Sequence, residues 1–112
     1  MRWPKPVTRT FWKPGQLARY LQASVPHGTP REIPIDYRRR RAILVAAGPR
    51  SSTGYAVRVL RVVERRSRIE VFVRERTPTL RDAVEPRVTF PYRLITIPAT
   101  TKRVYVQWRG RP

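Results

Sequence analysis

Few side chains in this 112-residue sequence could carry out catalysis. There is no cysteine and a single histidine, His27, so a thiol nucleophile, a histidine pair for zinc and a Ser-His-Asp triad are excluded. Glu75 follows an apolar stretch and is expected to lean inward and pair with an arginine. General acid–base catalysis would need a second acid in a cleft. The sequence therefore predicts no enzyme activity, no catalytic or metal site and no cofactor.

Positive charge is the dominant compositional feature. Lys and Arg total 25 against seven Asp and Glu, a formal net charge of +18, and 22 of the 25 are arginine. Such an excess favours a nucleic acid, an anionic membrane surface or an acidic protein as partner. The same excess also fits a compositional preference for arginine on a solvated surface. The densest run could grip phosphates or an acidic partner, or could lie in a solvated loop; it consists of Arg38, Arg39, Arg40 and Arg41.

The apolar content is sufficient for a folded core, because 40% of the residues are hydrophobic. The longest apolar run, 42–47, is far shorter than the roughly 20 residues of a membrane-spanning helix. No secretory signal is visible behind Met1, so a cytoplasmic protein is expected. The length is typical of one domain. We expect a flexible lead-in at 1–6 and one β domain at 7–112.

The pattern of apolar residues predicts a mainly β (α+β) protein, a small antiparallel β-sandwich or half-barrel with one short N-terminal helix. Helical spacing predicts that helix at 14–24, with Pro14 as its first residue and turn formers at 26–30 closing it. Strands are expected at 7–12, 42–47, 55–63, 69–76, 87–97 and 103–108. The strand at 42–47 is apolar on both faces, which is typical of the centre of a packed layer.

The expected strands at 55–63 and 69–76 form a hairpin whose register can be worked out from the sequence. Val62 falls opposite Val71 across a four-residue turn, whereas Val59 must fall opposite Val73 if both are to remain on the apolar face. One extra residue near Leu60-Arg61 reconciles the two pairings, so a β-bulge is predicted there.

The strand at 87–97 contains Pro91, which cannot donate to a ladder, so this strand is expected at a sheet edge or bulged. The sequence also predicts which side chains fill the core. They are Leu17, Leu21, Ile43, Val45, Val57, Val59, Val71, Val73, Ile95, Val104 and Val106.

Two further segments are candidate interaction sites, each with a structural alternative. The first consists of Thr53, Gly54 and Tyr55. It could be a recognition loop, or a turn in which Gly54 supplies a positive φ and Tyr55 faces the core. The second consists of Phe90, Pro91 and Tyr92. It could be an exposed docking patch on an edge strand, or a bulge whose rings fill the core.

Five stretches carry a resemblance to a known family. They are the strand and helix at 7–25, Ile35-Asp36-Tyr37, the loop from Gly48 to Thr53-Gly54-Tyr55, the stretch Val71-x-Val73-x-Glu75-x-x-Pro78, and Thr89-Phe90-Pro91-Tyr92 running on to Ile97-Pro98. In this order they resemble the C-terminal domain of the PrcB family of protease-complex subunits. The resemblance implies a non-catalytic protein that stabilises or assembles a surface protease complex, and family members often carry an export signal. The sequence departs from the family in having one glycine before Tyr55 and a basic turn at 65–68.

The 51–55 loop is also similar, more distantly, to the Thr-Gly-aromatic loop of chagasin-type cysteine-protease inhibitors, which insert it into a protease cleft. Val57 stands where those inhibitors have a tryptophan, and no Gly-rich second loop follows. The main hypothesis is an interaction module whose protein partner is acidic or belongs to a protease complex. The alternatives are a nucleic-acid-associated protein acting through backbone phosphates and a chagasin-like inhibitor.

Overall fold

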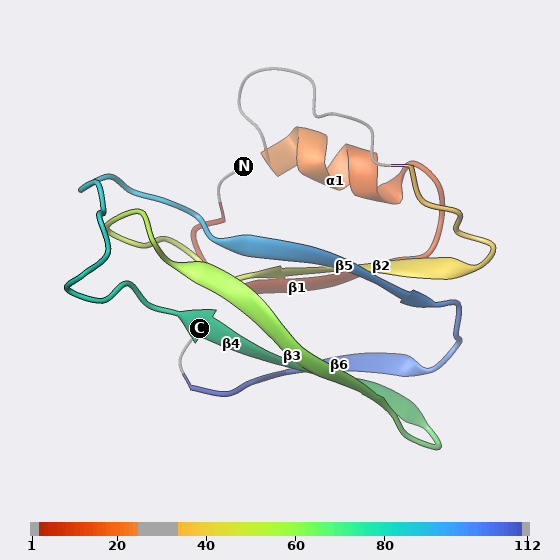
Figure 1. Ribbon diagram of the computed structural model, residues 1–112. Helices are drawn as coiled ribbons and strands as arrows, with labels where there is room; N and C mark the ends of the chain where they lie inside the picture. The colour runs from red at the N-terminus through yellow and green to blue at the C-terminus, as the bar shows by residue number, and fades with distance from the viewer. Residues whose placement is uncertain (1–2, 25–33, 111–112) are drawn as a thin grey trace.

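Three layers of secondary structure make up the fold (Figure 1). The structure is a computed structural model that describes residues 3–24 and 34–110. The helix lies over a sheet of order β1-β2-β5, the upper sheet, and a lower sheet of order β3-β4-β6 packs beneath it. In chain order the elements are β1 (Val7–Phe11), α1 (Gln16–Ser24), β2 (Arg40–Ala46), β3 (Ala56–Glu64), β4 (Arg68–Arg76), β5 (Tyr92–Pro98) and β6 (Arg103–Trp108).

The small β-sandwich expected from the sequence is confirmed, but one strand pair runs in an unexpected direction. Three of the pairs are antiparallel, whereas β6 lies parallel to β4, with Val71 beside Val106. After β4 the chain enters the upper sheet as β5 before it returns as β6. This detour allows β6 to start at the same end of the sheet as β4. The expectation of antiparallel pairing is therefore wrong for this one pair.

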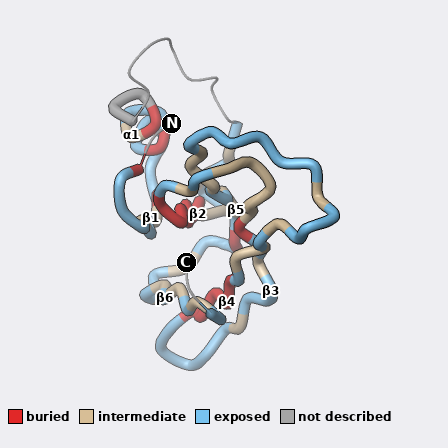
Figure 2. The backbone as a smooth tube through the Cα atoms, turned by 90° about the vertical axis from the view of Figure 1, so that its left-hand side faces the viewer, coloured by how far each residue is buried: buried red, intermediate tan, exposed pale blue. Residues whose placement is uncertain are grey.

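Strand β2 lies at the centre of the molecule and is buried on both faces, as its apolar run predicts. Ile43 and Val45 pack against side chains of the lower sheet, in a cluster that includes Val71. Leu44, which alternates to the opposite face, belongs to a second cluster with Leu17 of α1. Figure 2 shows this burial running through both sheets, with the exposed residues on the outer layers.

Helix α1 begins at Gln16 rather than at Pro14 as expected. Gly15 has φ +86°, outside the right-handed helical region, so the helix cannot include it. The Gln16 side chain accepts hydrogen bonds from the backbone N–H groups of Trp12 and Lys13, at 2.9 and 3.0 Å. The expected helix-closing residues at 26–30 lie outside the described residues. In the two described ranges, no helix is long and apolar enough to span a membrane.

The segment before β1 is anchored at Trp3, whose side chain is buried. Its ring lies edge-on to that of Tyr92, with 5.2 Å between centroids. Of the expected lead-in at 1–6, residues 1–2 lie outside the described part of the chain. The large aromatic surface that Trp3 removes from water favours this anchoring.

The predicted bulge and the predicted edge strand are both confirmed. The β3–β4 register shifts between Val59 and Arg61, with Val59 opposite Val73 and Val62 opposite Val71. Strand β5 lies at an edge of the upper sheet. It begins at Tyr92 rather than at Arg87 as expected, so Pro91 lies just before the strand and not within it.

Of the predicted core residues, seven are buried: Leu17, Leu21, Ile43, Val45, Val57, Val71 and Val73. The other four are partly buried and pack against the cluster between the sheets: Val59, Ile95, Val104 and Val106. These four residues come from β3, β5 and β6, which are edge strands of their sheets.

A buried carboxylate lies on the outer side of the lower sheet. Glu70 is only 4% exposed, because the side chains of Arg65, Arg68 and Gln107 cover it. Arg65 Nε donates to Glu70 Oε2 at 3.1 Å, and Arg68 Nη2 lies 2.9 Å from Oε1. The hydrogen bond from Arg65 is the largest cause that holds the pKa of Glu70 below its ordinary value near 4.5, and it outweighs the opposing effect of burial.

Folding stability is expected to fall in acid as Glu70 becomes protonated. Its pKa is lower in the folded state, so the stability it contributes is complete above about pH 4.5 and is lost as the pH falls through the folded-state value. Urea unfolding midpoints measured from pH 6 to about pH 3 check this. Glu70→Gln is expected to flatten the pH dependence, and an unchanged profile in that variant would contradict the assignment. Asp82, whose pKa is also lowered, contributes to the dependence that remains.

Candidate protein-interaction site

The β2–β3 connection (47–55) and the β4–β5 connection (77–91) lie side by side at one end of the sandwich (Figure 1). The Thr53 N–H donates to the Glu85 carbonyl at 3.1 Å, and the Glu85 N–H donates to Thr53 Oγ1 at 2.8 Å. The Thr89 hydroxyl donates to the Ser52 carbonyl at 2.7 Å. Because these bonds join the two connections, residues 47–55 and 77–91 together form one ordered surface, called here the loop surface.

Gly54 determines how closely the two connections approach. Its φ is +96°, a backbone conformation that other residues rarely adopt. A Cβ atom at this position would lie 2.9 Å from Pro78 Cβ and 3.0 Å from Val84 Cγ1. Any side chain would therefore strain the backbone and push residues 77–91 away. Gly54 thus supplies the positive φ that the structural alternative requires, whereas Tyr55, which that alternative places facing the core, is only partly buried.

An ion pair with little solvent exposure joins the loop surface to β4. Arg50 Nε donates to Glu75 Oε2 at 2.6 Å, and Nη2 donates to Oε1 at 3.2 Å. The two side chains are 18% and 7% exposed. Arg50 also forms an isolated antiparallel bridge with Thr89, and its guanidinium carbon lies 5.9 Å from the Tyr55 ring centroid. The prediction that Glu75 leans inward and pairs with an arginine is confirmed.

The two candidate segments from the sequence meet at a shallow open depression of about 380 Å³. Its lining includes Thr53, Gly54, Tyr55, Phe90, Pro91 and Tyr92. Phe90 packs against the cluster beneath α1, which fits the alternative in which the rings fill the core. Tyr92 is 43% exposed, which fits the alternative of an exposed docking patch. In the second segment, Phe90 therefore fits the interpretation of a core-filling ring, and Tyr92 fits that of an exposed docking patch.

The 77–91 connection also presents apolar side chains to solvent. Leu80 is fully exposed, and Val84 and Val88 are exposed as well. Asp82 orders this part of the chain: the Thr79 N–H donates to its Oδ2 at 2.7 Å, and Arg76 pairs with it at 3.2 Å. The hydrogen bond from Thr79 is the largest cause that lowers the pKa of Asp82. Since binding residues are often carried on ordered loops, these exposed side chains make the 77–91 connection a candidate protein contact site.

Sequence reasoning missed these exposed residues, although a signal is present. Residues 77–86 contain prolines and acids, so the sequence predicts only a long loop. Leu80 and Val84 have helical spacing, but they lie between Pro78 and Pro86 in a stretch too short for a stable helix. Apolar side chains that no element can bury are candidates for contact with a partner.

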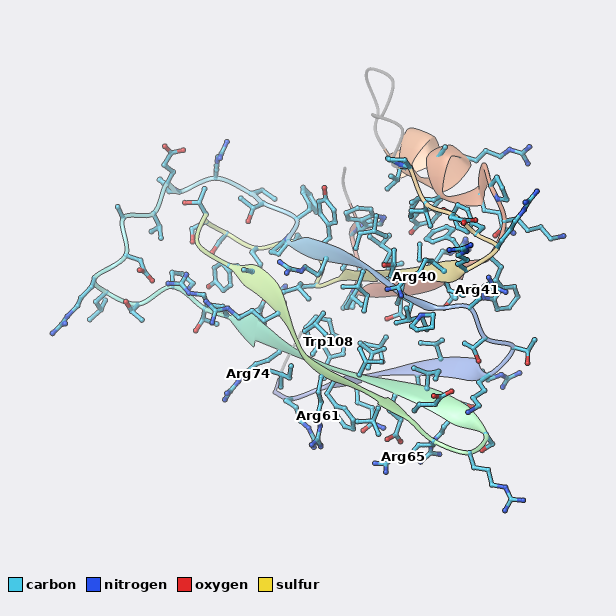
Figure 3. All side chains as sticks on the ribbon, turned by 45° about the vertical axis from the view of Figure 1, so that its right-hand side comes forward. Arg40, Arg41, Arg61, Arg65, Arg74 and Trp108 are labelled. Atoms are coloured by element: carbon cyan, nitrogen blue, oxygen red, sulfur yellow. The ribbon has the colours of Figure 1, made fainter. Side chains whose placement is uncertain are left out.

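The arginine run at Arg38–Arg41 is divided between the turn before β2 and the first two residues of β2. Arg38 and Arg39 are exposed in the turn before β2, and Arg39 lies 3.8 Å from Asp36. Arg40 donates from Nη2 to the Thr96 carbonyl at 2.9 Å, and Arg41 donates from Nη1 to the Tyr37 carbonyl at 2.9 Å. Figure 3 shows Arg40 and Arg41 on β2 at the end remote from the loop surface. The side chains of Arg40 and Arg41 are therefore engaged in hydrogen bonds within the fold.

The carboxylates of the described residues all pair with basic side chains. They are Asp36, Glu64, Glu70, Glu75, Asp82 and Glu85. In residues 3–24 and 34–110, no three carboxylate or imidazole groups come together in a way that could hold a metal ion. The acids present are thus engaged in ion pairs with arginine or lysine.

Comparison with protein families gives a match to the PrcB C-terminal family over residues 41–98, which is just over half of the chain. The match includes most of β2, all of β3, β4 and β5, and both connections of the loop surface. No curated protein and no solved structure matches the chain. The likeness carried by the motifs between Gly48 and Pro98 is confirmed, and the chain belongs to the PrcB C-terminal family.

Proposed function

We propose that the chain is a non-catalytic protein-interaction module that helps to stabilise or assemble a protease complex. Membership of the PrcB C-terminal family supports an association with such a complex. The loop surface is the proposed point of contact, because it combines an open depression with exposed apolar side chains. The partner is a protein that buries these apolar groups.

The observation that carries this proposal is the full exposure of Leu80 on a loop that is otherwise held in place. Ordering a loop upon binding costs free energy, so a loop that is already ordered loses less on association. Leu80 contributes little to the folded chain by itself, because its side chain remains in water. Its expected contribution is to a complex.

Replacing Leu80 with alanine is expected to weaken partner binding by about tenfold, equivalent to about 1.4 kcal/mol. The partner is first isolated from native extract with the full chain and identified by mass spectrometry, and affinities are then measured with purified components. Leu80→Ala should leave the urea unfolding midpoint unchanged. Leu60→Ala is the matched control, because Leu60 is half exposed but lies at the β3 bulge, outside the loop surface.

Two results would contradict the proposal. One is a partner that contains no protease or protease-complex component, which would remove the assigned role. The other is equal loss of affinity in Leu80→Ala and Leu60→Ala, which would remove the loop surface as the contact.

A further inference from the structure

The outer side of the lower sheet carries arginines that no acid neutralises. The ladder register places Arg58 of β3 directly opposite Arg74 of β4. Arg109 continues this row, because its N–H donates to the Val73 carbonyl at 2.8 Å just after the Val73–Trp108 pair. Arg58 in β3, Arg74 in β4 and Arg109 just after β6 thus form a single row across the sheet. Figure 3 shows Arg74, with Arg61 and Arg65, on the side of the lower sheet away from the rest of the molecule.

Phe72 of β4 lies beneath two guanidinium groups, one of which belongs to Arg109 of the row just described. The Arg61 and Arg109 guanidinium carbons lie 4.6 and 4.8 Å from the Phe72 ring centroid. Stacking of this kind leaves the N–H donors of a guanidinium available for another acceptor. The ring itself is only 4% exposed, so the surface that meets solvent here is basic rather than aromatic.

Arg103, at the start of β6, adds a fifth exposed arginine to this side of the sheet. Within the described part of the chain, none of these five arginines forms an ion pair, because the nearby Glu70 pairs with Arg65 and Arg68. We call this group the outer arginine face; it consists of Arg58, Arg61, Arg74, Arg103 and Arg109. Like charges directly opposite each other on neighbouring strands destabilise a sheet. Departures from such local rules are expected at functional sites.

We propose that the outer arginine face binds the phosphate backbone of a nucleic acid without sequence preference. Guanidinium groups match phosphate geometry, and a row of them across three strands offers several contacts at once. An acidic protein is a poorer fit, because the centres of protein interfaces are apolar and depleted in charge. The exposed large apolar side chains of β3, β4 and β6 are Leu60, Val62 and Tyr105. The register places Tyr105 on this side and Val62 opposite Val71, and Leu60 lies in the bulge.

Salt dependence of binding to a short duplex DNA tests this proposal with the full chain. The logarithm of the binding constant falls with the logarithm of salt by about 0.9 for each neutralised phosphate. The triple variant Arg58→Gln/Arg74→Gln/Arg109→Gln is therefore expected to flatten the slope by about 2 to 3. The matched control, Arg19→Gln/Arg38→Gln/Arg81→Gln, removes the same number of charges from exposed positions on other elements. It is expected to change the slope by less than about one.

Two further variants keep the test decisive. Arg58→Gln/Arg74→Gln leaves the Phe72 stacking intact, so it should fold normally and flatten the slope by about two. The triple lysine variant at positions 58, 74 and 109 keeps the charge and should retain the parent slope. Equal flattening in the face and control variants would overturn the proposal. A second result would also overturn the proposal: a polyglutamate peptide binds the parent more tightly than the duplex does, and the triple variant no longer binds the peptide. That result would identify an acidic protein as the partner instead.

Discussion

Arg50→Ala is expected to lower the free energy of unfolding by about 3–5 kcal/mol, a large part of the stability of a small domain. The change removes both hydrogen bonds to Glu75 and leaves that carboxylate 7% exposed without its partner. A buried charge without a partner is far more costly than an exposed one. Urea unfolding followed by tryptophan fluorescence measures the loss.

Two comparisons separate the buried pair from a general effect of losing arginine. Arg87→Ala breaks the exposed pair with Glu85 and is expected to cost less than about 1 kcal/mol. The double variant Arg50→Met/Glu75→Leu removes the whole buried pair and is expected to regain much of the loss, because apolar residues often replace such pairs without penalty. A loss for Arg50→Ala no greater than that for Arg87→Ala would show that the pair contributes little.

Ile43→Ala is expected to lower the free energy of unfolding by about 2–5 kcal/mol. Ile43 is fully buried at the centre of β2, between the two sheets, and its neighbours there include Val45 and Val71. Truncation removes apolar contacts and leaves a cavity that β strands on both sides cannot easily fill. Chemical denaturation of the variant and the parent under the same conditions gives the difference.

Leu80→Ala serves as the reference for this second experiment. It also truncates a large aliphatic side chain, but one that is fully exposed, so its expected effect is within about 0.5 kcal/mol. If Ile43→Ala cost as little as Leu80→Ala, the packing described between the sheets would not be the main source of stability.

Local patterns in the sequence predict those parts of the fold that depend on neighbouring residues. The parity conflict between Val59 and Val62 has one economical solution, and the bulge lies where that solution requires it. The central position of β2 follows from side chains that are apolar on both faces of one strand. The parallel pairing of β6 with β4 could not be predicted in this way, because it depends on the path of the chain through the upper sheet rather than on either strand's own residues.

The candidate site shows the same division. The sequence identifies Gly54 and Tyr92 as parts of separate segments, but their meeting at one depression depends on how residues 47–55 and 77–91 pack. The pairing of Glu75 with an arginine is predictable from charge and position. The choice of Arg50 is not, because it requires the bridge to Thr89 that brings the two connections together. Contacts between residues distant in sequence are therefore the information that the motifs lack.

The return of the chain from β5 to β6 has a consequence for self-association. β4 contains five consecutive buried residues, Ile69–Val73, all apolar except Glu70, and such a strand at a sheet edge would offer a template for pairing with other copies of the chain. β6 occupies that edge and replaces it with a short strand that has an exposed arginine at its start and another just after its end. A lower sheet without β6 would leave this edge of β4 open to aggregation. By covering this edge of β4, β6 thus protects the chain against self-association.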